Sequence, residues 1–189
     1  MTPPVALTIA GSDSGGGAGI QADLKTFAAL GVHGASALTA VTAQNTTGVT
    51  AIHAIPPEVV RAQIDAVAAD LHPAAAKTGM LGSAAVVGAV AEAVRSAGLT
   101  TLVVDPVMVA KGGARLLDED AVAAVRALIV PLAAVLTPNL PEAETLLGRA
   151  IGDLDDRRRA AAELLQLGCR AVVLKGGHSE SDAIDVFCT

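Results

Sequence analysis

Near its N-terminus the chain reads Ile9-Ala-Gly-Ser-Asp-Ser-Gly-Gly-Gly-Ala-Gly-Ile-Gln-Ala-Asp-Leu-Lys-Thr26. The apolar run 5–10 leads into this stretch, and residues 22–30 continue it with apolar side chains at helical spacing, which predicts a strand, a loop and a helix. The glycines of the loop are Gly11, Gly15, Gly16, Gly17 and Gly19. Because glycine carries no β-carbon, backbone N–H groups and the N-terminus of the helix can face a polar or anionic ligand together.

Two nucleotide-binding motifs are excluded in this loop. No Gly-Lys-Ser/Thr closes it as in a Walker A loop, and Gly15-x-Gly17-x-x-Ile20 lacks the third glycine of a dinucleotide fingerprint. A flexible connector is disfavoured because the loop lies directly between a strand and a helix. Asp23 lies one turn into the helix, where it could face back toward the loop or complement the helix dipole.

Composition indicates one globular domain over residues 1–189, with no linker or internal repeat. Hydrophobic residues make up 52% and charged residues 17%, which excludes disorder. Two phenylalanines are the only aromatic residues and the net charge is −6, so a nucleic-acid partner is disfavoured. Two cysteines without metal-ligand spacing, no basic leader and no long apolar run favour a soluble cytoplasmic protein without a membrane partner.

Strands and helices alternate along the rest of the chain. We expect strands at 34–43, 49–55, 74–77, 102–105, 133–137, 171–174 and 184–188, and helices at 57–71, 83–97, 118–129, from 138 and at 153–167. This alternation is typical of an α/β fold in which helices cover both faces of a mostly parallel sheet.

Polar residues follow many of these strands. They are Gly11 to Gly19, Gln44 and Asn45, Lys77 to Met80, Asp105, Asn139 with Glu142, and Lys175 to His178. In an open parallel sheet, ligands bind beyond the carboxyl ends of the strands. We therefore expect these groups to gather at one edge of the sheet.

Three of these residues carry oxygen atoms that suit a magnesium ion bridged to phosphate. Asp105 ends an apolar strand, where an unpaired carboxylate would be costly. Asn139 and Glu142 are three residues apart at the start of a helix, which places them on one face. An N-cap at Asn139 with a capping-box partner at Glu142 is the structural alternative, and a metal-side role gains weight beside Asp105.

Two further polar side chains have both a functional and a structural interpretation. Lys175, followed by Gly176 and Gly177, could neutralise a transferring phosphoryl group, or it could be an exposed loop lysine. Gln44 has an amide that donates and accepts, as an aminopyrimidine edge requires, or it could stabilise a turn. Lys77 ends a strand, and pairing with a carboxylate is one role open to it.

These motifs resemble the hydroxymethylpyrimidine/phosphomethylpyrimidine kinases of thiamine biosynthesis, which belong to the ribokinase-like superfamily. The resemblance extends to Asp105-Pro-Val-Met108 and Asn139-x-x-Glu142, and it implies a three-layer αβα fold, ATP and Mg²⁺ as cofactors, and a homodimer as one expected assembly. The implied reaction phosphorylates 4-amino-5-hydroxymethyl-2-methylpyrimidine and then its monophosphate. The resemblance implies pyrimidine contacts at Gly11, Ala18, Asp23, Gln44, Met80 and Val107. It places Asp105 and Glu142 at the metal, Asn139, Lys175, Gly176 and Gly177 at the nucleotide, and a catalytic role on Lys175.

The sequence departs from the family in one respect. Relatives have a later Gly-Thr-Gly-Cys turn that forms an anion hole, and no Gly-Thr-Gly occurs here. Cys188 is not its counterpart, because it lies in an apolar run that is typical of a hairpin strand. We therefore expect a C-terminal segment, with the general base, to be missing; without one, the phosphoryl-transfer centre would be incomplete.

Three other functions stay open. A pyridoxal or pyridoxine kinase of the same superfamily would act on a similar hydroxymethyl heteroaromatic substrate. A non-catalytic module could keep the pyrimidine pocket without the anion hole. A dinucleotide-binding domain is disfavoured, because the third glycine and an acidic ribose partner are both absent.

Overall fold

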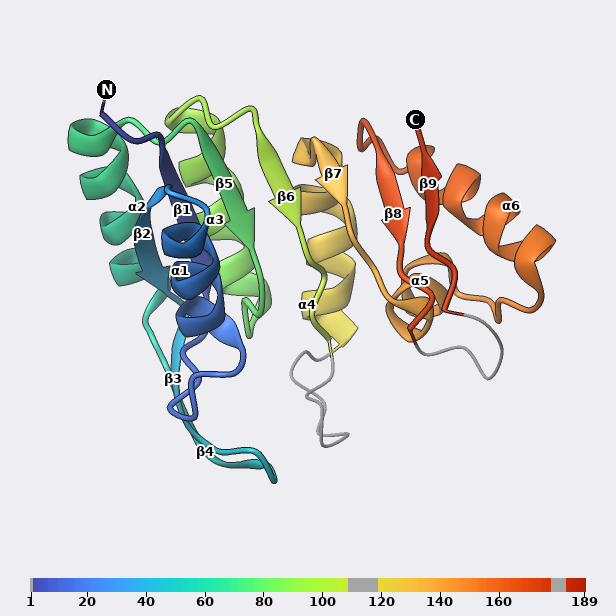
Figure 1. Cartoon of the computed structure of the whole chain (residues 1–189), viewed down its shortest axis with the longest axis horizontal. Coiled ribbons are helices and arrows are strands. Elements are labelled where there is room, and N and C mark those ends of the chain that lie inside the picture. Colours follow the sequence, from blue (N-terminus) through green and yellow to red (C-terminus); the bar gives the residue numbers. More distant parts are fainter. Residues whose placement is uncertain (1, 109–118, 178–182) are drawn as a thin grey trace.

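The computed structural model describes residues 2–108, 119–177 and 183–189. Within these residues a seven-stranded sheet has the order β2-β1-β5-β6-β7-β8-β9 (Figure 1). Neighbouring strands are parallel, except that β9 runs antiparallel to β8. The strands are β1 (Val5–Ala10), β2 (His33–Leu38), β5 (Ala75–Thr78), β6 (Leu102–Val104), β7 (Val135–Leu136), β8 (Val172–Leu174) and β9 (Val186–Cys188).

Helices cover both faces of this sheet. Helix α1 packs on β1 and β2 from one face, whereas α2, α3 and α4 lie on the other, and α6 packs on β8 and β9 and against α5 (Figure 1). The helices are α1 (Gly19–Ala29), α2 (Pro57–Leu71), α3 (Ala84–Ser96), α4 (Glu119–Ala124), α5 (Leu140–Leu147) and α6 (Leu154–Leu165). The expected α/β fold with a mostly parallel central sheet is confirmed.

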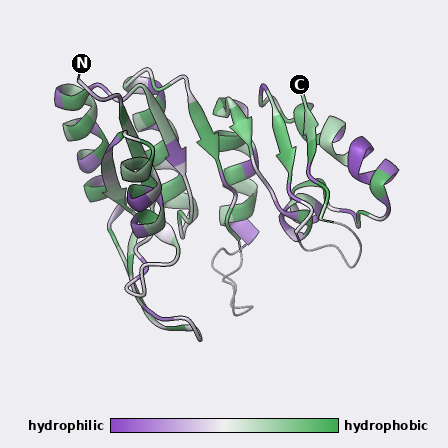
Figure 2. Ribbon diagram, viewed as in Figure 1, coloured by the Kyte–Doolittle hydropathy of each residue, from purple (hydrophilic) through white to green (hydrophobic). Residues whose placement is uncertain are grey.

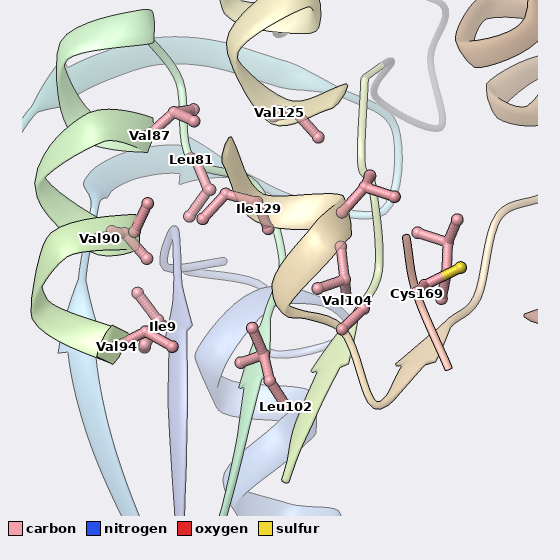
Figure 3. Packing of buried hydrophobic residues seen from close by; sticks show 14 of the residues in the cluster. Ile9, Leu81, Val87, Val90, Val94, Leu102, Val104, Val125, Ile129 and Cys169 are labelled. Carbon is pink, nitrogen blue, oxygen red and sulfur yellow. The ribbon is translucent and has the colours of Figure 1, made fainter. Parts of the chain in front are cut away.

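The core lies between the sheet and these helices and is built from aliphatic side chains. The strands are mostly apolar, with Lys77 of β5 as a charged exception, and many hydrophilic residues lie on the helices (Figure 2). Val87, Val90 and Val94 of α3 pack toward Ile9 and Leu102 of the sheet (Figure 3), and all five are fully or almost fully buried. Burying each such side chain contributes about 1.5–3 kcal/mol to the stability of the fold. The packed core thereby holds in place the strand ends that carry the polar groups.

A separate two-stranded hairpin extends beyond the carboxyl ends of the central strands (Figure 1). Its strands are β3 (Ala40–Gln44) and β4 (Val49–Ala54), with an irregularity in the pairing at Ala43 and Gln44. The prediction of one strand over 34–43 was wrong, because the chain leaves the sheet at Thr39. The hydroxyl of Thr39 donates to the carbonyl of Met80 at 2.6 Å and its N–H donates to Ala10 at 3.0 Å, which fixes the break.

The helix expected over 118–129 changes character along its length. Residue 118 lies outside the described residues, α4 covers 119–124, a π-helical segment follows at Val125–Ile129, and a 3₁₀ turn ends it at Val130–Leu132. Pro131 has no N–H to continue the helical hydrogen bonds, which gives a physical reason for the stop. No helix among the described residues is long and apolar enough to cross a membrane.

Candidate active site

A cavity of about 740 Å³ opens at the carboxyl ends of β1, β5 and β6, between the glycine loop and the β3–β4 hairpin. The six residues expected to contact a pyrimidine all line it: Gly11, Ala18, Asp23, Gln44, Met80 and Val107. Lys77 and Asp105 line it as well. The sequence therefore predicted correctly that these strand ends meet.

The glycine loop does not present all its amides to the cavity, as the sequence suggested. The carboxylate of Asp13 accepts hydrogen bonds from Gly15, Gly17 and Ala18 at 2.8–2.9 Å. Burial, the largest single influence, raises the pKa of Asp13, but the loop amides together outweigh it and lower that pKa below its ordinary value. The prediction of an anion-binding loop was wrong for these three amides, because the chain's own aspartate occupies them.

Glycine is required at position 19 for a different reason. Gly19 has a φ of +56°, and a β-carbon there would collide with the carbonyl of Gly11. That same carbonyl accepts the N–H of Ile20 at 3.0 Å. The end of β1 and the start of α1 are thereby held together.

The other wall of the cavity is formed where the glycine loop pairs with β3. The Ser14 hydroxyl donates to the backbone carbonyl of Gln44 at 2.6 Å and accepts the Gln44 N–H at 2.7 Å. The Thr42 hydroxyl donates to the Ser12 carbonyl at 2.7 Å. This pairing fixes the backbone of Gln44, whose side-chain oxygen lies 3.3 Å from the Thr42 hydroxyl.

Asp23 faces the sheet rather than the loop. Its carboxylate accepts the Thr8 hydroxyl at 2.6 Å, and Lys77 Nζ donates to both of its oxygens at 3.0 Å. Because the first turn of α1 carries no acidic residue, Asp23 does not act as the helix-dipole partner considered above. The carboxylate pairing open to Lys77 is confirmed.

A row of alternating charges continues from this pair toward β8. Lys77 Nζ lies 3.9 Å from Oδ2 of Asp105, and Lys175 Nζ donates to Oδ1 of Asp105 at 2.9 Å. The side chains of Lys77, Asp23 and Asp105 are each less than a quarter exposed. Partial burial reduces screening by water, so these ion pairs are stronger than those on an open surface.

The helix start at Asn139 confirms the capping-box alternative. The Asn139 side chain accepts the N–H of Glu142 at 2.9 Å, and the Glu142 carboxylate accepts the N–H of Asn139 at 2.8 Å. Glu142 is 6% exposed, and burial raises the pKa of its carboxyl, with the negative charge of Asp105 acting in the same direction. Lys175 bridges to Asn139 through the backbone and lies near enough to Glu142 to counteract that rise.

Gly176 and Gly177 differ in the space available for a side chain. A β-carbon on Gly176 would collide with the backbone of Ile184, and the Gly176 N–H donates to Asp185 at 2.8 Å. Close packing against residues 184–185 explains this glycine. Gly177 has open space around it, as the approach of a ligand would require. His178 lies outside the described residues.

The carboxylate oxygens of Asp105 and Glu142 could bind a magnesium ion only if phosphate oxygens also serve as ligands. No group of three or more His, Cys, Asp or Glu side chains that could hold a metal occurs among the described residues. Magnesium in nucleotide sites uses one or two carboxylates, several waters and the phosphates themselves. Two neighbouring carboxylates, whose charges interact, fit that donor set.

Sequence reasoning missed the roles of Asp13 and Ser14. An aspartate two residues before a glycine is typical of a turn in which the side chain accepts backbone N–H groups, and this signal could have revealed Asp13. The pairing of Ser14 with Gln44 joins residues 30 positions apart and has no local signature.

Comparisons with known proteins agree with this geometry. Residues 13–189 match the family described as phosphomethylpyrimidine kinase. The chain is 56% identical over 177 residues to hydroxymethylpyrimidine/phosphomethylpyrimidine kinase of Bacillus subtilis, with 94% of this chain and 65% of that protein covered. The Haemophilus influenzae protein of the same name is 56% identical over 173 residues, with coverages of 92% and 64%. The chain thus spans slightly less than two thirds of these relatives.

Solved structures give the same fold. A crystal structure of phosphomethylpyrimidine kinase from Clostridium difficile superposes with a TM-score of 0.92 at 46% identity, covering 98% of this chain and 80% of that one. Pyridoxal kinase of Staphylococcus aureus in complex with pyridoxal gives a TM-score of 0.90 at 34% identity, with 100% and 69% covered. The ribokinase-like fold is confirmed, and the chain belongs to the phosphomethylpyrimidine kinase family.

Proposed function

We propose that this protein transfers the γ-phosphoryl group of ATP to the hydroxymethyl group of 4-amino-5-hydroxymethyl-2-methylpyrimidine, and then a second one to the monophosphate, for thiamine diphosphate synthesis. The observation that carries the proposal is one cavity lined by all six residues expected to hold the pyrimidine. Asp105, at the edge of this cavity, pairs with Lys175, which bridges through its backbone to Asn139 at the start of α5. ATP as the phosphoryl donor supports a cytoplasmic location, which is part of the proposal.

The cavity suits a flat, neutral heterocycle with polar edges. The Gln44 amide can donate to a ring nitrogen and accept from an amino group. Asp23 retains acceptor capacity beside the amino edge, because each carboxylate oxygen has two lone pairs. Met80 and Val107 supply apolar contact, while the Ser14–Gln44 pairing holds the wall in place.

The chemical step proposed is an in-line displacement at phosphorus. The substrate hydroxyl oxygen forms a bond to the γ-phosphorus, the bond to the ADP oxygen breaks with its electron pair, and the hydroxyl proton leaves to a base. Lys175 would balance the charge spread over the transferring group, which is most of what a protein contributes to this reaction. Asp105 and Glu142 would hold magnesium with the nucleotide phosphates, and the ion would neutralise phosphate charge.

Pyridoxal is the second candidate acceptor. Pyridoxal kinases of S. aureus and B. subtilis superpose with TM-scores of 0.90 and 0.89 over nearly the whole chain. Pyridoxal also carries a hydroxymethyl group on a flat heteroaromatic ring. The higher identity to pyrimidine kinases, 56% against 34–39%, favours the pyrimidine.

Parallel assays of the intact gene product test this choice. Steady-state kinetics with ATP and each acceptor should give a higher kcat/KM for the pyrimidine than for pyridoxal. A clear preference for pyridoxal would overturn the substrate assignment. Calorimetric binding of the pyrimidine without ATP turnover would instead favour a non-catalytic module.

A further inference from the structure

We propose that Lys77 recognises the phosphate of the monophosphate acceptor and thereby governs the second phosphoryl transfer. The inference rests on the proposed function and deepens it. In that second step an oxygen of the pyrimidine monophosphate attacks the γ-phosphorus of ATP. A P–O–P bond forms to give the diphosphate, and ADP leaves with the electron pair of the broken bond.

The charge of the cavity decides where a phosphate could lie. Among the described residues that line it, three carry carboxylates, namely Asp13, Asp23 and Asp105, and Lys77 alone carries a cation. A dianionic phosphate is repelled by the carboxylates. Lysine is a common phosphate ligand and offers three N–H donors.

The glycine loop cannot take over this task with its three central amides. Those of Gly15, Gly17 and Ala18 are already bound to the Asp13 carboxylate. A second anion there would have to displace a buried aspartate that is ionised and held by three short hydrogen bonds. Lys77 is therefore the remaining cationic donor in the cavity.

Lys77 also has an N–H donor that its bonds to Asp23 do not use, and it lies between the two proposed halves of the site. Two of its hydrogen bonds go to Asp23, whereas its distance of 3.9 Å to Asp105 is too long for a hydrogen bond. It lies between Asp23, on the proposed pyrimidine side, and Asp105, on the proposed nucleotide side. The phosphate of the monophosphate must lie in that interval, because it is attached to the pyrimidine ring and carries the oxygen that attacks the nucleotide.

The test compares both acceptors in the intact gene product, because loss of Lys77 also removes the cation that pairs with Asp23 and so affects both. Lys77→Met should lower kcat/KM for the monophosphate relative to that for the alcohol by about 10- to 100-fold, the worth of a charged hydrogen bond. Lys77→Arg, which keeps the charge, should restore most of the ratio. Lys25→Met removes a lysine that bonds to the Gly16 carbonyl outside the cavity lining and should leave the ratio unchanged.

Two binding measurements keep the inference testable if turnover or folding fails. Titration calorimetry without nucleotide should show Lys77→Met losing affinity for the monophosphate far more than for the alcohol. In the wild-type protein, the monophosphate should protect Lys77 from an amine-reactive reagent more strongly than the alcohol does. Equal losses for both acceptors, or equal protection, would overturn the role of Lys77 and leave it as a tether for Asp23. Wild-type protein that phosphorylates neither acceptor, yet shows the binding difference, would instead count against the proposed function alone.

Discussion

Lys175 donates a 2.9 Å hydrogen bond from Nζ to Oδ1 of Asp105, although the two residues are 70 positions apart in the sequence. Asp105 follows β6 and Lys175 follows β8, so the parallel sheet alone brings them to one edge. Through Lys77 the same carboxylate is connected to Asp23 in the cavity. The pyrimidine side and the phosphate side of the proposed site are thus one electrostatic unit.

Gln44→Ala should weaken pyrimidine binding without weakening ATP binding. Loss of the amide removes one or two hydrogen bonds to the ring, so affinity for the pyrimidine should fall by about 5- to 100-fold. ATP affinity should stay within about twofold, because Gln44 lies on the hairpin, away from Lys175. Calorimetry with each ligand measures both, and exposed Gln166→Ala serves as the control. A parallel loss of ATP affinity would contradict the assignment.

Asp13→Asn should loosen the glycine loop. The variant turns an NH₂ group toward N–H groups that the carboxylate now accepts, and unfolding free energy at pH 7 should fall by about 1–3 kcal/mol. Because the folded-state pKa of Asp13 is lowered, its stabilisation is complete above the ordinary value of 3.8 and is lost as pH falls through the folded-state value. Denaturation of the wild type and of Asp13→Asn from pH 7 down into acid measures the difference in unfolding free energy. Exposed Asp70→Asn serves as the control. A difference that persists unchanged in strong acid would be inconsistent with this account.

Glu142→Gln should separate stability from function. Burial raises the pKa of Glu142 in the folded state and so disfavours its ionised form there. The contribution of Glu142 to the free energy of unfolding is therefore fully present below pH 4.5. It is lost as the pH rises through the folded-state pKa. Glutamine keeps an oxygen for the Asn139 N–H, so the variant should be at least as stable as the wild type at pH 7 and lose that advantage below pH 4.5. Turnover should fall sharply, because the variant loses one of the two carboxylates proposed to hold magnesium. Unchanged turnover would remove Glu142 from the site.

Gly176→Ala and Gly177→Ala form a matched pair. The first introduces a β-carbon against the Ile184 backbone and should cost about 1–3 kcal/mol of unfolding free energy. The second meets open space and should change stability by less than about 0.5 kcal/mol. Thermal denaturation of the two variants measures the contrast, and equal stabilities would refute the packing explanation.

The sequence predicted the site well where topology alone decides. Parallel strands end at one edge of a sheet, so Lys77 and Asp105 could be placed together from strand direction without any measured distance, whereas Gln44 reaches the site on the separate β3–β4 hairpin. Contacts between segments far apart in the chain could not be predicted from the sequence. Neither the Asp23–Lys77 pair, 54 residues apart, nor the collision that fixes Gly176 against Ile184 has a local pattern. The amides of the glycine loop were misassigned because a ligand and Asp13 would satisfy them equally well.

The most direct test of the central claim is Asp105→Asn in the intact gene product, with turnover and pyrimidine binding measured on the same preparation. Removing the carboxylate that pairs with Lys175 should lower kcat by at least about 100-fold, since it removes a charge from the proposed phosphoryl-transfer side of the site. The dissociation constant for the pyrimidine should stay within about threefold. Exposed Asp155→Asn, which pairs only with Arg158 among the described residues, should change neither. Equal losses of turnover and pyrimidine binding in Asp105→Asn would contradict the account.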